Sequence, residues 1–165
     1  MEPVRFASRA VTASPAAFER WLMSTGMTAG PIEGLGLRFG EVRALAAAVR
    51  DVLGAVADAQ VPPAGSTARL NGASAAVPFA PALRIEGDRG VLVDDPPTPR
   101  RPAEVLAALA RSVIRFVGSA NAERLRRCPA CGDLYVASRP DRVWCSASCG
   151  NRARVARHHA RRRAD

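Results

Sequence analysis

The chain has 165 residues and 48% of them are hydrophobic, enough for one domain of ordinary size with its own core and a small appended module. No apolar run approaches the roughly 20 residues that a membrane-spanning helix needs, and residues 1–14 lack the long apolar segment of a secretory signal. These features argue against a membrane or secreted protein. We expect a cytoplasmic protein, in which thiols stay reduced.

The net charge of +9 is concentrated near the end of the chain. Residues 121–165 contain eleven arginines and four acidic residues, whereas residues 1–120 contain thirteen and eleven. If four cysteine thiolates hold one zinc ion, the charge of the last segment falls from +7 to about +5, which is still strongly basic. Such a cluster predicts a polyanionic partner, most simply nucleic acid.

The first predicted helix begins at Ser14-Pro15, because serine caps helix starts and proline is favoured in the first turn. Phe18, Trp21 and Leu22 then recur on one face until Gly26, so we expect these aromatic side chains in the core. The glycine-rich segment 30–40 lacks the ending of a phosphate-binding loop and is predicted to be a plain loop.

The main helix is predicted over residues 39–59, with Pro62-Pro63 after it and a short, weak helix around Leu70. Its apolar stripe consists of Val42, Leu45, Val49, Val52, Leu53 and Val56.

Two short strands, residues 83–85 and 91–93, are predicted to form a hairpin, which residues 94–102 follow as a stiff linker. A second long helix is predicted over residues 103–117, with Gly118 as its stop. We expect the two long helices to pack on each other with the hairpin alongside.

The first 120 residues offer no constellation for nucleophilic or metal-assisted chemistry. No histidine precedes His158, no cysteine precedes Cys128, and the carboxylates fall on exposed helix faces or in turns. We therefore expect no enzyme and no catalytic residue, although folding could still bring a carboxylate pair together.

All four cysteines lie in the last quarter of the chain, in two close pairs separated by thirteen residues. This spacing is typical of a structural zinc site, in which four thiolates surround one tetrahedral ion and leave no open position for water. The predicted ligands are Cys128, Cys131, Cys145 and Cys149. The second pair of cysteines, and the absence of a βαβ context, argue against a redox or catalytic thiol protein.

The local pattern around the cysteines predicts a treble-clef-like finger. Cys128 to Gly132 fits a tight knuckle, and residues 134–136 and 143–144 are expected to form a hairpin. Ser146 is a predicted N-cap that places Cys149 in the first turn of a helix running to about residue 162. Tyr135 and Trp144 are expected to form a miniature core rather than base-stacking platforms.

Arginines of the hairpin turn and of the last helix are the candidate nucleic-acid contacts. At 100° per residue, Arg154, Arg157, His158 and Arg161 share one helix face, whereas Arg152 could instead point back toward the finger. His158 and His159 are not expected as ligands, because four cysteines complete the site. The full candidate set is Arg139, Arg142, Arg152, Arg154, Arg157, Arg161 and Arg162.

The motif Cys149-Gly150-Asn151-Arg152, with the preceding segment 142–146 and the basic helix after it, resembles the CGNR-type zinc finger of bacterial proteins. That family places the finger after a mainly helical ABATE domain. The order of helices in residues 1–120, the Pro62-Pro63 break and the segment 106–112 resemble that domain. The resemblance implies a stress-linked transcription regulator with a DNA-binding finger.

The expected fold is mainly α with a small β-hairpin, divided into an ABATE-like domain over 1–120 and a zinc finger over 121–165. The leading hypothesis is a homodimeric DNA-binding regulator with one structural Zn²⁺, whose first domain binds a small-molecule effector, mediates dimerisation, or both. Two alternatives stay open: an adaptor whose arginines dock on an acidic protein, and an RNA-binding protein, although 5% aromatic content argues against stacking on single strands.

Overall fold

The structure is a computed structural model that describes residues 3–8, 10–80, 82–93 and 98–164. It is mostly helical, at 55%, with two small antiparallel hairpins. The helices are α1 (Pro3–Phe6), α2 (Pro15–Ser24), α3 (Phe39–Ala57), α4 (Ala64–Ala75), α5 (Pro102–Val117) and α6 (Ala147–Ala164), with 3₁₀ turns η1 (Gly36–Arg38) and η2 (Ala120–Arg124). The strands are β1 (Ala82–Glu86), β2 (Arg89–Val93), β3 (Leu125–Arg127) and β4 (Leu134–Val136).

Helix α2 begins as its sequence predicts. The side-chain oxygen of Ser14 accepts a hydrogen bond from the backbone N–H of Ala17 at 3.2 Å, which satisfies one of the free donors of the first turn. Phe18, Trp21 and Leu22 are buried, and Gly26 ends the turn with a φ of 70°. The aromatic residues of this helix therefore belong to the core, as expected.

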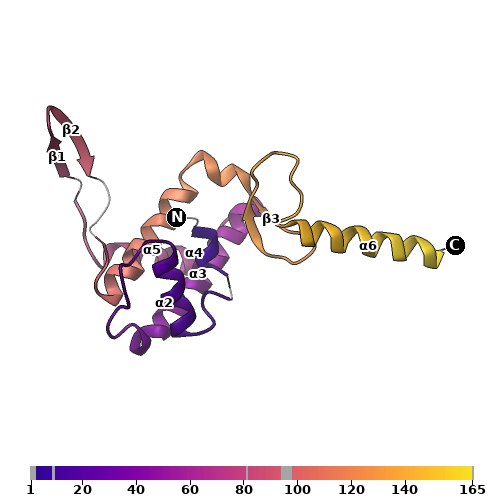
Figure 1. The fold of residues 1–165 in the computed structure, drawn as a ribbon, viewed down its shortest axis with the longest axis horizontal. Helices are drawn as coiled ribbons and strands as arrows, with labels where there is room; N and C mark the ends of the chain where they lie inside the picture. The colour runs from indigo at the N-terminus through magenta and orange to yellow at the C-terminus, as the bar shows by residue number, and fades with distance from the viewer. Residues whose placement is uncertain (1–2, 9, 81, 94–97, 165) are drawn as a thin grey trace.

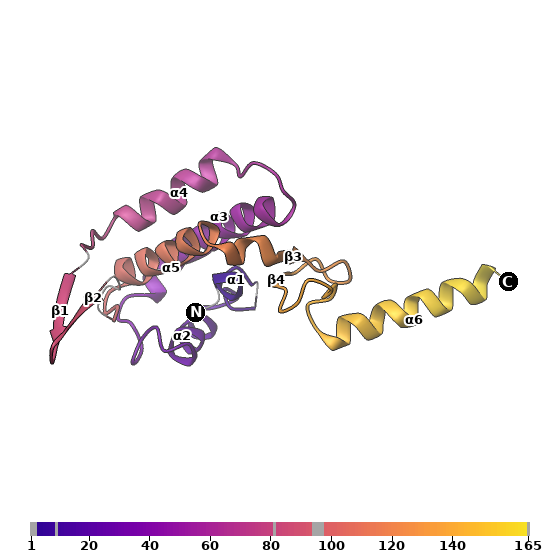
Figure 2. The same cartoon turned by 90° about the horizontal axis from the view of Figure 1, so that it is seen from above.

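The two long helices α3 and α5 pack on each other, which confirms the prediction from their apolar stripes. Val49 and Leu53 of α3 and Leu109 and Val113 of α5 are fully buried. Helix α4, short and rich in small residues, packs on both long helices through Leu70. These helices form one layered body with α1 and α2 (Figure 2).

The hairpin of β1 and β2 forms as predicted, with Leu83 opposite Leu92 and Glu86 opposite Arg89. Its predicted position beside the two long helices is wrong. Every residue of β1 is exposed, and the hairpin projects from the helical body at the end opposite to α6 (Figure 1). The place beside α3 and α5 is taken by α4 instead, because α4 packs on both. Of the predicted linker, residues 94–97 lie outside the described residues.

The second hairpin differs from its prediction. Strand β4 pairs with β3, with Arg126 opposite Tyr135, and residues 143–144 form a loop. The reason is that the first cysteine pair lies in the turn that joins β3 to β4, so the knuckle itself closes the hairpin. Helix α6 then leaves the finger as a single rod that points away from the body (Figure 2).

The hairpin of the finger shares the core of the helical domain. Leu125, the first residue of β3, is 1% exposed and belongs to the same cluster of buried side chains as α3 and α5. Leu134 and Val136 of β4 pack against that cluster. The segment that carries the first cysteine pair is therefore fixed on the helical body. None of the helices in the described ranges has both the length and the apolar character needed to cross a membrane.

Candidate zinc centre and nucleic-acid interface

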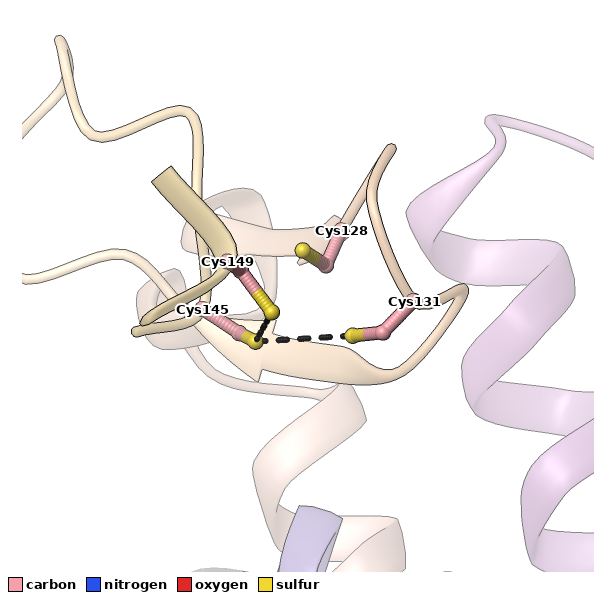
Figure 3. Close-up of side chains that lie close together, drawn as sticks. All are labelled: Cys128, Cys131, Cys145 and Cys149. Atoms are coloured by element: carbon pink, nitrogen blue, oxygen red, sulfur yellow. Dashed lines mark hydrogen bonds between the residues drawn. The ribbon is translucent and has the colours of Figure 1, made fainter. Parts of the chain in front are cut away.

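The four cysteine side chains converge on one point, as the spacing of the two pairs predicts (Figure 3). All four sulfur atoms lie within 4.8 Å of one another. The Sγ atoms of Cys131 and Cys145 are 3.5 Å apart and those of Cys145 and Cys149 are 3.6 Å apart. These separations are too long for a disulfide bond of about 2.05 Å, and all four cysteines are free.

The sulfur arrangement fits a tetrahedral zinc ion. Zinc–sulfur bonds of about 2.3 Å place the corners of such a site about 3.8 Å apart, close to the separations between Cys131, Cys145 and Cys149. Cys128 and Cys149 are buried, whereas Cys131 is exposed at the edge of the site. Four thiolates complete the coordination of one structural Zn²⁺, which then links the hairpin to α6.

Backbone hydrogen bonds shape the first knuckle. The N–H of Cys128 donates to the carbonyl of Asp133 at 2.8 Å, and the N–H of Gly132 donates to the carbonyl of Cys128 at 2.8 Å. Gly132 has a φ of 77°, a conformation that side chains with a Cβ rarely adopt. The glycine after the second cysteine therefore turns the chain back into β4.

The second cysteine pair is held by the start of α6. Ser146 directly precedes the helix, and its Oγ accepts a hydrogen bond from the N–H of Cys149 at 3.2 Å, so the predicted cap is present. Cys149 lies in the first helical turn, so the cap that begins the helix also fixes the position of this ligand. The metal site and the helix start thus stabilise each other.

The cysteines differ in how readily they lose a proton before metal binds. Burial alone raises the pKa of the Cys128 thiol, but hydrogen bonds from the backbone of Cys145, Ala130 and Cys131 lower that pKa to about 6. A hydrogen bond from the backbone of Asp133 lowers the pKa of Cys131, but burial and the neighbouring sulfurs together raise it by more, so the net effect is a raised pKa. Burial is also the main cause of a raised pKa at Cys145. Metal binding must therefore displace protons from the last two.

Tyr135 and Trp144 form the small core of the finger, as predicted. Tyr135 is 9% exposed and its hydroxyl donates to the carbonyl of Arg142 at 2.7 Å. Trp144 is half-buried against the first turn of α6, where a Cβ added at Gly150 would lie 3.1 Å from its Cδ1. The glycine of the Cys-Gly-Asn-Arg motif therefore lets the indole approach the first turn of α6 closely.

Arg142 is committed to bracing the finger, although it stands among the predicted nucleic-acid contacts. Its guanidinium donates to the carbonyl oxygens of Trp144 and Cys145 and to Ser138 Oγ, and it lies 5.5 Å from the ring centre of Tyr135. These contacts hold the loop before the second cysteine pair. Its charge still contributes to the field of this surface.

The other predicted contacts extend from the finger to the far end of α6. Arg154 donates to the side-chain oxygen of Asn151, and Arg157 donates to the carbonyl of Ala153 at 3.4 Å. Both also line a recess of about 390 Å³ beside Trp144. The side chain of Arg161 lies outside the described residues. The exposed members of the set are Arg139, Arg142, Arg152, Arg154, Arg157 and Arg162.

A further residue of the finger was not among the sequence predictions. Arg127, at the end of β3, donates to both carboxylate oxygens of Asp58 at the end of α3, with a shortest distance of 2.7 Å, and to the carbonyl of Gly132 in the knuckle at 3.4 Å. These hydrogen bonds lower the pKa of the Asp58 carboxyl and raise that of the Arg127 guanidinium. The guanidinium crosses α3 at Gly54, where a Cβ would lie 2.9 Å from it. Arg127 thus clamps the knuckle to the helical domain.

Two family models match the chain in the order that the sequence predicts. Residues 9–120 match the ABATE family, whose description reads "Putative stress-induced transcription regulator", and residues 124–162 match the CGNR zinc finger. Neither family is a family of enzymes. No curated protein is found to match the chain. Because the first match alone covers more than half of the residues, the chain belongs to the ABATE family and carries a CGNR zinc finger after the ABATE domain.

Proposed function

We propose that this protein is a bacterial DNA-binding transcription regulator, active in the cytoplasm, in which the zinc ion is structural. The observation that best supports this proposal is α6, an 18-residue helix that leaves the zinc centre as an isolated rod (Figure 1). It contains six arginines and no acidic residue. A single helix of this kind fits the major groove of DNA, which is about 12 Å wide.

Arginines on α6 supply the phosphate contacts in this proposal. Arg154 and Arg157 are exposed and line the recess beside Trp144, so a phosphate seated there would meet two guanidinium groups. Arg139, Arg152 and Arg162 are also exposed and add positive charge, and Arg161 remains a proposed contact from its position in the sequence. Such contacts set affinity and register, whereas base recognition requires further side chains in the groove.

The helical domain is proposed to sense a small-molecule effector. A cavity of about 480 Å³ lies between α3, α4 and α5. Leu45 and Leu106 contribute apolar surface to it, and Arg69 contributes positive charge, whereas Arg38 is paired at 2.7 Å with Glu41 of the same lining. This lining suits a small molecule with an apolar body and an acidic group.

Binding to duplex DNA at a series of salt concentrations tests the proposal. For the zinc-loaded chain we expect affinity to fall steeply as salt rises, with a slope of about −0.9 per phosphate contact. Arg154→Ala and Arg157→Ala should each reduce that slope by about one unit. Arg20→Ala is the matched control, since Arg20 is an exposed arginine of α2 and should leave the slope unchanged.

Other outcomes would favour the alternatives. Equal or tighter binding to single-stranded or structured RNA would point to RNA as the partner. An absence of affinity for either nucleic acid, together with binding to an acidic protein that Arg154→Ala and Arg157→Ala weaken, would point to an adaptor and refute the proposal.

A further inference from the structure

The projecting hairpin of β1 and β2 exposes several large apolar side chains. Leu83 is 72% exposed, Ile85 is 65% exposed and Val91 is 37% exposed. A two-stranded hairpin is at best marginally stable in water, and exposed apolar strands with open edges favour pairing with another chain. In the two-stranded sheet, the outer edge of β1 is therefore open to pairing with another strand.

The open edge of β1 presents defined backbone groups. Glu86 pairs with Arg89 across the two-residue turn Gly87-Asp88, where Gly87 has a φ of 65°. In such a hairpin the pair that closes the turn exchanges backbone hydrogen bonds, and the pattern alternates along the strand. Arg84 and Glu86 thus direct their backbone groups to β2, whereas Leu83 and Ile85 direct theirs outward, to the unpaired edge.

We propose that β1 pairs antiparallel with β1 of a second copy of this chain, about a two-fold axis at Ile85, to form a four-stranded sheet. This proposal deepens the homodimer expected for a DNA regulator, but it requires no DNA. In this register Arg84 lies opposite Glu86 of the partner subunit, and Glu86 lies opposite Arg84 of the partner subunit. Ile85 and its copy exchange the outward backbone hydrogen bonds.

Charge complementarity selects this register over its neighbours. A two-fold axis at Arg84 would place two arginines opposite each other, and an axis at Glu86 would place two glutamates opposite each other. Within one chain the Arg84–Glu86 ion pair is long, at 3.4 Å, and both side chains are more than half exposed. That pair therefore stabilises the monomer little, and both charges remain accessible to a second strand.

Sedimentation of the zinc-loaded full chain, without DNA, tests the proposal. The wild type should self-associate in a concentration-dependent manner. Arg84→Glu places like charges opposite each other at both symmetric positions, and so does Glu86→Arg, so each variant should weaken self-association about tenfold. An equimolar mixture of the two variants should recover association, because every cross-strand pair then unites opposite charges. Far-ultraviolet circular dichroism confirms that each variant is folded.

Recovery in the mixture separates the proposed pairing from a general loss of hairpin stability, which mixing would not repair. A monomeric wild type, or association that the single variants do not change, would overturn the proposal. It would also be overturned if the variants lost only DNA affinity, since the hairpin would then be a DNA-binding arm. Arg154→Ala and Arg157→Ala should leave self-association intact, so a failure of DNA binding is distinguishable from a failure of this dimer.

Discussion

Replacing Leu125 by alanine should destabilise the helical domain, although Leu125 belongs to the zinc finger. The side chain is 1% exposed and lies in the same buried cluster as the long helices. Leucine-to-alanine changes at such sites cost about 3 kcal/mol, because the removed atoms leave a cavity. For a protein of this size that loss corresponds to a fall in Tm of roughly 6–12 °C.

Tryptophan fluorescence can follow the helical domain separately. Trp21 is buried in that domain, whereas Trp144 lies in the finger, so a Trp144→Phe background leaves one reporter of the helical core. The zinc-loaded protein would be melted with and without Leu125→Ala. Leu37→Ala serves as the control, because Leu37 is 93% exposed, lies outside the β1 edge, and its loss should change stability by no more than about 0.5 kcal/mol.

An unchanged Trp21 transition in Leu125→Ala would refute the reasoning. It would mean that the hairpin of the finger adds nothing to the helical core and that the two parts unfold independently. A fall in Tm at Trp21, by contrast, would place the first cysteine pair and the helical domain in one cooperative unit.

Further predictions concern the clamp and the metal. Gly72→Ala, at an open helical position, should raise the free energy of unfolding by about 0.5–1 kcal/mol. Gly54→Ala should raise it less, because the new methyl group displaces the Arg127 guanidinium. Equal gains in urea titrations would contradict a stabilising role for the contact between Arg127 and α3. Zinc must displace protons from at least two thiols, those of Cys131 and Cys145, whose pKa values are raised, so its affinity should fall at least about a hundredfold for each unit by which the pH is lowered. Competition with a chromophoric chelator at two pH values would measure this fall, and a pH-independent affinity would contradict it. Removing zinc with a chelator should lower the Trp21 transition temperature without unfolding the helical domain; an unchanged Tm would show that the metal does not support the shared core.

The helices and the ligand set could be predicted from the sequence because their signals are local. The apolar stripe from Val42 to Leu53 identifies α3, and the serine at position 146 marks the start of α6. Two close cysteine pairs identify a four-thiolate site, since tetrahedral zinc restricts the spacing strongly.

The misplaced and missed features depend on contacts between distant residues. Residues 143–144 have strand-forming side chains, yet β3 takes the position beside β4 because the knuckle joins the two strands directly. Arg127 and Asp58 are 69 positions apart, and neither local pattern indicates the other. The hairpin at residues 82–93 could be identified from its two short strands and the turn between them. Its place in the fold could not be predicted, because α4 occupies the surface of the long helices where the hairpin was expected.

The attachment of α6 has a mechanical consequence. The helix is about 27 Å long, since each of its 18 residues adds about 1.5 Å, and it points away from the body from its anchor at the zinc centre. A tilt of about 5° at that anchor displaces its tip by roughly 2.4 Å. Arg127 connects the knuckle beneath that anchor to the last turn of α3. A slight shift of α3 would therefore be amplified along α6 as along a lever.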